Sequence, residues 1–172
     1  LSSDAFNNHV HKVFDQLERD VDAIVCAEPA IDSNQILSSV SFAGGGFRTM
    51  TYAPMIYRLL QSGRVDGNTT FHGASLGALY SIISCLMTCD HDQEEALAAA
   101  RKVYIHITYY VANINVSWYG MWGRLYDVTY AGVSSIDPKF LDCFQGKCNI
   151  STTQLTPFPR NRIINTFDSI DD

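Results

Sequence analysis

Two glycine-rich motifs, separated by one helix-like segment, constrain the fold of this chain more than any other feature. The first is the run of three glycines at 44–46, and the second is the sequence Gly-Ala-Ser-Leu-Gly at 73–77. Each follows a short apolar segment, and the serine of the second motif comes 29 residues after the last glycine of the first. One crossover helix and one strand span about that distance, so both motifs are expected at the same edge of a parallel sheet.

The pattern around these motifs predicts an α/β fold. Residues 36–44 and 69–74 have the composition of short buried strands, whereas 47–61 and 76–88 have apolar residues at helical spacing. A strand–helix–strand–helix order within about fifty residues predicts a parallel sheet covered by helices. Pro54 interrupts the first helical segment and is expected to kink it.

The remaining segments are less constrained. Residues 5–25 predict an amphipathic helix, a long helix is expected after the acidic segment that starts at Asp90, and residues 148–167 predict a strand pair around a proline-containing turn. The aromatic-rich segment 115–132 fits either a packed surface loop or an apolar rim that meets lipid. We therefore expect an N-terminal helix and linker at 1–35, followed by one domain at 36–172.

Composition excludes several classes of function. The net charge is −6 and the basic residues are scattered, which argues against nucleic-acid binding. No apolar run is long enough to span a membrane, and the polar start of the chain is not a signal peptide. Three glycosylation sequons are compatible with the secretory route, whereas the lack of a signal peptide is compatible with the cytoplasm. The compartment therefore stays open between the cytoplasm, a lipid surface and the secretory route. The sequence lacks an initiator Met, so we expect a processed product or a piece of a longer chain.

The 73–77 motif matches the G-x-S-x-G elbow, in which a serine sits on a strained turn between a strand and a helix. At such a turn the positions two before and two after the serine come close together, so Gly73 and Gly77 avoid a collision. The turn holds the hydroxyl of Ser75 clear of the surface, and the positive end of the next helix faces the developing oxyanion. Ser75 is therefore the candidate nucleophile.

The glycines at 44–46 leave backbone N–H groups unobstructed between a strand and a helix. A dinucleotide site would need a third glycine where Thr49 stands, and the acidic residue at a suitable distance, Asp66, lies in a turn. A phosphate-binding P-loop would need Gly-Lys-Ser/Thr, which is absent. An oxyanion hole for acyl transfer fits better, and no cofactor is expected.

Together, "SFAGGGFRTMTYAPMIYRLL" and "FHGASLGAL" resemble the patatin-like phospholipases and acylglycerol lipases. The resemblance is firm over residues 38–88 and looser over 148–172. It implies a three-layer α/β/α architecture with a mostly parallel sheet, apparently truncated at its C-terminus, and a lipid ester substrate at a membrane or lipid-droplet surface. It makes Ser75 the nucleophile and the amides around Gly44, Gly45 and Gly46 the oxyanion donors. Arg48 would fix the loop or meet substrate charge, although a structural salt bridge at the helix start explains it equally well.

The sequence shows no clear general base that would accept the Ser75 proton. The resembling family uses a Ser–Asp dyad with the aspartate in a D-G-G or D-G-A motif after the serine, whereas Asp66-Gly67, the one Asp-Gly here, precedes it and reads as a turn. We therefore expect the dyad aspartate beyond residue 172. A histidine base is disfavoured: His72 is expected to point across the sheet as a core residue, and His91 and His106 lack an acid in the usual order. No cluster of His, Cys and acids has metal-ligand spacing.

The cysteines leave alternatives open. Cys85 and Cys89 read as small apolar residues of a buried helix, whereas Cys143 and Cys148 could form a hairpin disulfide or remain two free thiols. For the whole chain two hypotheses stand: a serine lipid-acyl hydrolase whose N-terminal catalytic half has little activity alone, or a catalytically incomplete module that binds lipid surfaces.

Overall fold

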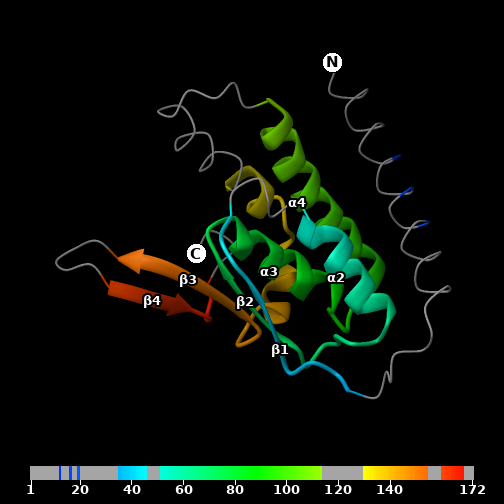
Figure 1. The fold of residues 1–172 in the computed structure, drawn as a ribbon, viewed down its shortest axis with the longest axis horizontal. Coiled ribbons are helices and arrows are strands. Elements are labelled where there is room, and N and C mark those ends of the chain that lie inside the picture. The colour runs from blue at the N-terminus through cyan, green and yellow to red at the C-terminus, as the bar shows by residue number, and fades with distance from the viewer. Residues whose placement is uncertain are drawn as a thin grey trace.

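A computed structural model defines the fold (Figure 1). The structure describes Lys12, Gln16, Arg19 and residues 35–45, 51–113, 130–154 and 160–168, without the side chains of 109–113 and 154. Its elements are β1 (Ser39–Phe42), α2 (Tyr52–Gln61), β2 (Thr70–Ala74), α3 (Leu76–Met87), α4 (Gln93–Asn113), the 3-10 helix η2 (Pro138–Cys143), β3 (Cys148–Gln154) and β4 (Arg160–Ile164). The α/β class predicted from the sequence is confirmed.

The four strands form one mixed sheet in the order β1-β2-β3-β4. β1 pairs with β2 and β2 with β3 in parallel, whereas β3 and β4 are antiparallel. The expectation of a mostly parallel sheet therefore needs correction on its β4 side. The physical reason is the short connection, because the five residues between Gln154 and Arg160 cannot make the crossover that a parallel pair requires.

Helix α3 is the centre of the core. It contacts β1, β2 and β3 on one side and α2, α4 and η2 on its other sides (Figure 1). Every residue of α3 except Ala78 is buried. Its buried hydroxyls need no outside partner, because Ser81 and Ser84 donate to the carbonyl oxygens of the residues four positions earlier. A helix surrounded in this way can be apolar all round, as the sequence of α3 is.

An aromatic cluster joins β1 to the helices near the first glycine motif. Phe42 packs against Phe71 of β2 and Tyr80 of α3, and Tyr52 meets Tyr80 edge-on. The Tyr52 hydroxyl also donates to the Ala43 carbonyl oxygen at 3.3 Å. The end of β1 and the start of α2 are thereby held against the core.

Helices α2 and α4 can be compared with the helices that the sequence predicts at 47–61 and after Asp90. Helix α2 begins at Tyr52, so Pro54 lies in its first turn, where the missing N–H breaks no intrahelical hydrogen bond. Pro54 is therefore not the interior residue of α2 that the sequence predicted it to be. The long helix is confirmed as α4, and Asp66 forms the predicted turn by accepting from the backbone N–H of Asn68 at 2.8 Å.

The cysteines pair differently from the hairpin alternative. A disulfide joins Cys89, just beyond α3, to Cys143 at the end of η2, and Cys85 and Cys148 are buried free thiols. Burial raises the pKa of the Cys85 thiol well above its ordinary value, and contact with Cys148 adds to this effect. Cys85 is the apolar filler that the sequence predicted, whereas Cys89 is not.

Several predictions fall mostly outside the described residues. They concern the helix at 5–25, of which Lys12, Gln16 and Arg19 have helical backbone, and the aromatic-rich segment 115–132, of which only 130–132 is described. Over the part of the chain that the structure describes, no helix combines the length and apolar character needed to cross a bilayer.

Candidate active site

Ser75 occupies the sharp turn between β2 and α3. Its backbone has φ 54° and ψ −134°, a conformation that costs a non-glycine residue of the order of 1–3 kcal/mol. The residue is exposed, although its neighbours Leu76 and Gly77 are buried. The turn therefore presents the side chain to solvent at the end of a strand, as the motif predicts.

Both glycines that flank the serine are required by close packing. A Cβ atom on Gly73 would overlap the carbonyl oxygen of Gly77, and a Cβ atom on Gly77 would overlap the carbonyl oxygen of Phe42. The first turn of α3 thus lies directly on the ends of β1 and β2. This contact fixes where the helix begins, and with it the position of Ser75.

The first glycine motif lies against the second. A Cβ atom on Gly44 would come within 3.0 Å of the Ser75 Cβ atom and 3.3 Å of the Ala74 carbonyl oxygen. Such a distance is shorter than ordinary van der Waals contact, so a side chain on Gly44 would require Ser75 or Ala74 to shift by a few tenths of an ångström. The sequence prediction that one crossover brings the two motifs together is confirmed at this residue.

The rest of the predicted oxyanion loop is only partly described. Gly45 follows Gly44 and is exposed, whereas Gly46 and Arg48 lie outside the described residues. The N-terminal end of α3, a helix of 12 residues, begins directly after Ser75. Its first backbone N–H groups and its dipole favour negative charge at this end.

No described residue stands as a base beside Ser75. Among the described residues, none forms a hydrogen bond with its Oγ atom. His72 is half-buried on β2, where its Nε2 lies 3.5 Å from the hydroxyl of Thr70, so it is not the fully buried core residue that the sequence suggested. His91 lies beside the disulfide, and His106 is on α4.

The pKa of His106 lies below the ordinary value of histidine. Partial burial lowers its pKa, and the nearby Lys102 charge lowers it further. His106 packs near Gly132, because a Cβ atom on Gly132 would lie 3.6 Å from the Cβ atom of His106. His106 therefore belongs to the packing between α4 and the segment at 130–133.

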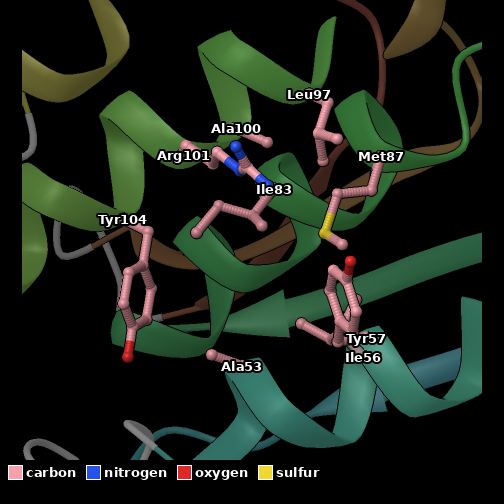
Figure 2. A pocket seen from close by; sticks show the side chains of 9 residues that line it. All are labelled: Ala53, Ile56, Tyr57, Ile83, Met87, Leu97, Ala100, Arg101 and Tyr104. Atoms are coloured by element: carbon pink, nitrogen blue, oxygen red, sulfur yellow. The ribbon is translucent and has the colours of Figure 1, made fainter. Parts of the chain in front are cut away.

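An apolar groove lies between α2, α3 and α4 (Figure 2). Figure 2 shows Ala53, Ile56 and Tyr57 from α2 facing Ile83 and Met87 from α3, with Leu97, Ala100, Arg101 and Tyr104 of α4 on the third side. Burial raises the pKa of Tyr104 above its ordinary value. Ile83 is eight residues beyond Ser75, about 12 Å along the helix axis.

Comparisons with known protein families, curated proteins and solved structures find no match to this chain. The resemblance to patatin-like lipases therefore stands on the two motifs and their spacing alone. What the structure adds is the local geometry of residues 42–44 and 73–77.

Proposed function

We propose that this chain is the N-terminal catalytic part of a serine lipid-acyl hydrolase in which Ser75 is the acyl-accepting nucleophile. The single observation that carries the proposal is the exposed Ser75, held at φ 54° between β2 and α3. A strained, exposed serine on a strand-to-helix turn is a costly feature, and such strain concentrates at functional sites. The close packing of both flanking glycines supports the assignment, since the surrounding backbone holds the turn in this conformation.

The oxyanion of the tetrahedral intermediate would form between Ser75 and the loop that contains Gly44. A Cβ atom on Gly44 would lie 3.0 Å from the Ser75 Cβ atom, and this close approach of the two segments supports the proposal that their backbone amides serve one oxyanion. The beginning of α3 adds a partial positive charge there. Preorganised donors of this kind are typically the largest single contribution to acyl-transfer catalysis, at roughly 3–4 kcal/mol per donor.

The base that accepts the Ser75 proton belongs, in this proposal, to an aspartate after residue 172. The described histidines offer no alternative, because His72, His91 and His106 have their contacts elsewhere. The three-layer architecture with helices on both faces of the sheet is part of the same proposal. A fatty acyl ester is the proposed substrate, which would be met at a membrane or lipid-droplet surface.

Fluorophosphonate labelling tests the nucleophile. The protein is expressed with its downstream reading frame and treated with a fluorophosphonate probe, and the modified residue is located by peptide mass spectrometry. We expect labelling of Ser75 that is lost in Ser75→Ala. The matched control is Ser62→Ala, because the Ser62 hydroxyl donates to the Leu59 carbonyl oxygen in ordinary backbone geometry. Labelling that persists in Ser75→Ala would discard the proposal.

A lipid-surface module without turnover is the second candidate. The observation that favours it is the absence, among the described residues, of any base in contact with Ser75. Sedimentation with phosphatidylcholine vesicles separates the two candidates when it is combined with ester hydrolysis measurements. Binding that is equal in wild type and Ser75→Ala, with no hydrolysis by either, would support the module.

A further inference from the structure

The end of α3 opposite Ser75 carries a second group of reactive side chains. Cys89 and His91 lie just beyond the helix, and Cys143 is the last residue of η2. Both sulfur-bearing residues are buried, at 5% and 4% exposure, whereas His91 is exposed. The 12 residues of α3 separate this group from Ser75 by about 18 Å, so the two sites are independent.

The three side chains converge on a common point. The Nε2 atom of His91 lies 3.9 Å from the sulfur of Cys89 and 3.9 Å from the sulfur of Cys143. Its Nδ1 atom lies 3.7 Å from the sulfur of Cys89. In a tetrahedral zinc site, with Zn–S near 2.3 Å and Zn–N near 2.0–2.1 Å, the edge between sulfur and nitrogen is about 3.6 Å. In the disulfide form the imidazole nitrogen therefore lies close to that edge length from both sulfur atoms, which must separate from each other before they can share a zinc ion.

We propose that Cys89, His91 and Cys143 form a zinc site that is available only when the Cys89–Cys143 disulfide is reduced. Reduction by two equivalents of a small-molecule thiol breaks the S–S bond, gives two cysteine thiols and leaves the reductant as its own disulfide. Binding of Zn²⁺ then releases the two thiol protons and forms two Zn–S bonds and one Zn–N bond. The site proposal does not depend on the hydrolase proposal.

The chemistry of the ligands favours zinc. Thiolate and imidazole ligands in one site select zinc over magnesium or calcium, which prefer oxygen. Opening of the disulfide needs only rotation of the two cysteine side chains, since the Cα atoms are already 5.6 Å apart. The His91 ring stacks on the ring of Phe140, with centroids 6.2 Å apart, and this contact limits where the ring can turn.

The proposed site leaves a fourth coordination position open. Within the described part of the chain, the group of candidate ligands contains these three residues and no fourth. The nearby carboxylate of Asp92 is taken up by an ion pair with Lys139 at 3.1 Å. A three-ligand site of this kind keeps one position for water or an external ligand.

Cobalt substitution tests the site on the full 172-residue chain. The protein is reduced with a phosphine, desalted under anaerobic conditions and titrated with Co²⁺ and then Zn²⁺. We expect thiolate-to-cobalt charge-transfer absorption that saturates near one metal per chain and is displaced by zinc. The oxidised protein, carried through the same titration, is expected to show none.

Variants assign the ligands. His91→Gln removes the exposed imidazole and is expected to weaken zinc binding by roughly 100-fold or more, because even the loss of a supporting group outside the ligand set costs 10–100-fold. Cys143→Ser is expected to abolish the charge-transfer band. The matched control is Cys148→Ala, a buried free thiol outside the group, which should bind cobalt as the wild type does.

Two results would overturn the proposal. One is a reduced wild-type chain that gives no cobalt absorption above that of Cys143→Ser. The other is a His91→Gln variant that binds zinc as tightly as the wild type, which would leave a two-cysteine site without the imidazole.

Discussion

At the scale of single residues, Ser75 is the centre of the proposed chemistry. Its side chain is exposed, and its backbone adopts a conformation that only glycine adopts without strain. Asp92 is the other described non-glycine residue with positive φ, at 49°. Because strain of this kind persists only where surrounding structure imposes it, Ser75 is held by its glycine neighbours and not by its own preference.

The strain at Ser75 predicts that Ser75→Gly is more stable than the wild type but is no longer labelled. Ser75→Gly should raise the free energy of unfolding by about 1 kcal/mol, since relief of the strain exceeds the entropy that glycine adds to the unfolded chain. It should also remove fluorophosphonate labelling. Urea unfolding of Ser75→Gly and Ser75→Ala measures the difference, because alanine keeps the strain. Equal stability of the two variants would contradict the strained geometry.

Gly77 carries the second prediction at this scale. Gly77→Ala places a methyl group on the Phe42 carbonyl oxygen and should lower the free energy of unfolding by roughly 3 kcal/mol, the upper end of typical overpacking costs. Gly132→Ala is the matched control, because its new Cβ atom would be 3.6 Å from the nearest atom, in helical backbone. That control should be neutral or slightly stabilising. Thermal unfolding of both variants distinguishes them.

The residue scale also shows what the sequence could predict. Motif spacing was enough to bring Gly44 to Ser75 and to explain Gly73 and Gly77, because one crossover fixes that geometry. It was not enough to describe His72, since whether a strand residue is buried depends on what covers that face of the sheet. The role of Arg48 stays a prediction.

At the scale of elements, α3 organises the molecule. It contacts three strands, two helices and η2, and it is buried along almost its full length. Local patterns predicted β1, α2, β2, α3 and α4, because hydrophobic periodicity is a local signal. They missed the 3-10 helix η2, which is short and starts with a cap in which Asp137 accepts from the Lys139 backbone N–H.

The central place of α3 predicts a large effect of Leu86. This side chain has no exposed surface, so Leu86→Ala should lower the free energy of unfolding by about 2–5 kcal/mol through lost apolar contact and a residual cavity. Met55→Ala on α2, where the side chain is 39% exposed, is the matched helical control and should change the free energy of unfolding far less. Chemical denaturation followed by circular dichroism measures both. A Leu86→Ala loss no larger than that of Met55→Ala would contradict the central packing of α3.

At the scale of the whole molecule, the Cys89–Cys143 disulfide ties α3 to η2 across 54 residues of sequence. No local pattern could have predicted this pairing. Cys148 is closer to Cys143 along the chain, but the parallel pairing of β3 with β2 carries Cys148 into the core beside α3, where it is fully buried. Tertiary packing therefore decides which sulfur atoms meet.

This crosslink should contribute measurably to stability. Closing a loop of this length stabilises the folded state by about 4 kcal/mol in the chain-entropy account. Cys143→Ser should therefore lower the free energy of unfolding by up to that amount, measured without added metal. A non-reducing digest of Cys85→Ala should yield a peptide pair linked through Cys89 and Cys143, and its absence would contradict the disulfide.

The tight seating of α3 on the strands has a consequence for how such a chain can diverge. The positions on either side of the turn are closed to any larger residue, because main-chain oxygen atoms fill the space. The residue at the apex is exposed, so its side chain meets no comparable steric barrier, although every residue other than glycine carries backbone strain there. A lineage could thus lose or regain the proposed nucleophile through one codon, while the scaffold that presents that position is inherited unchanged.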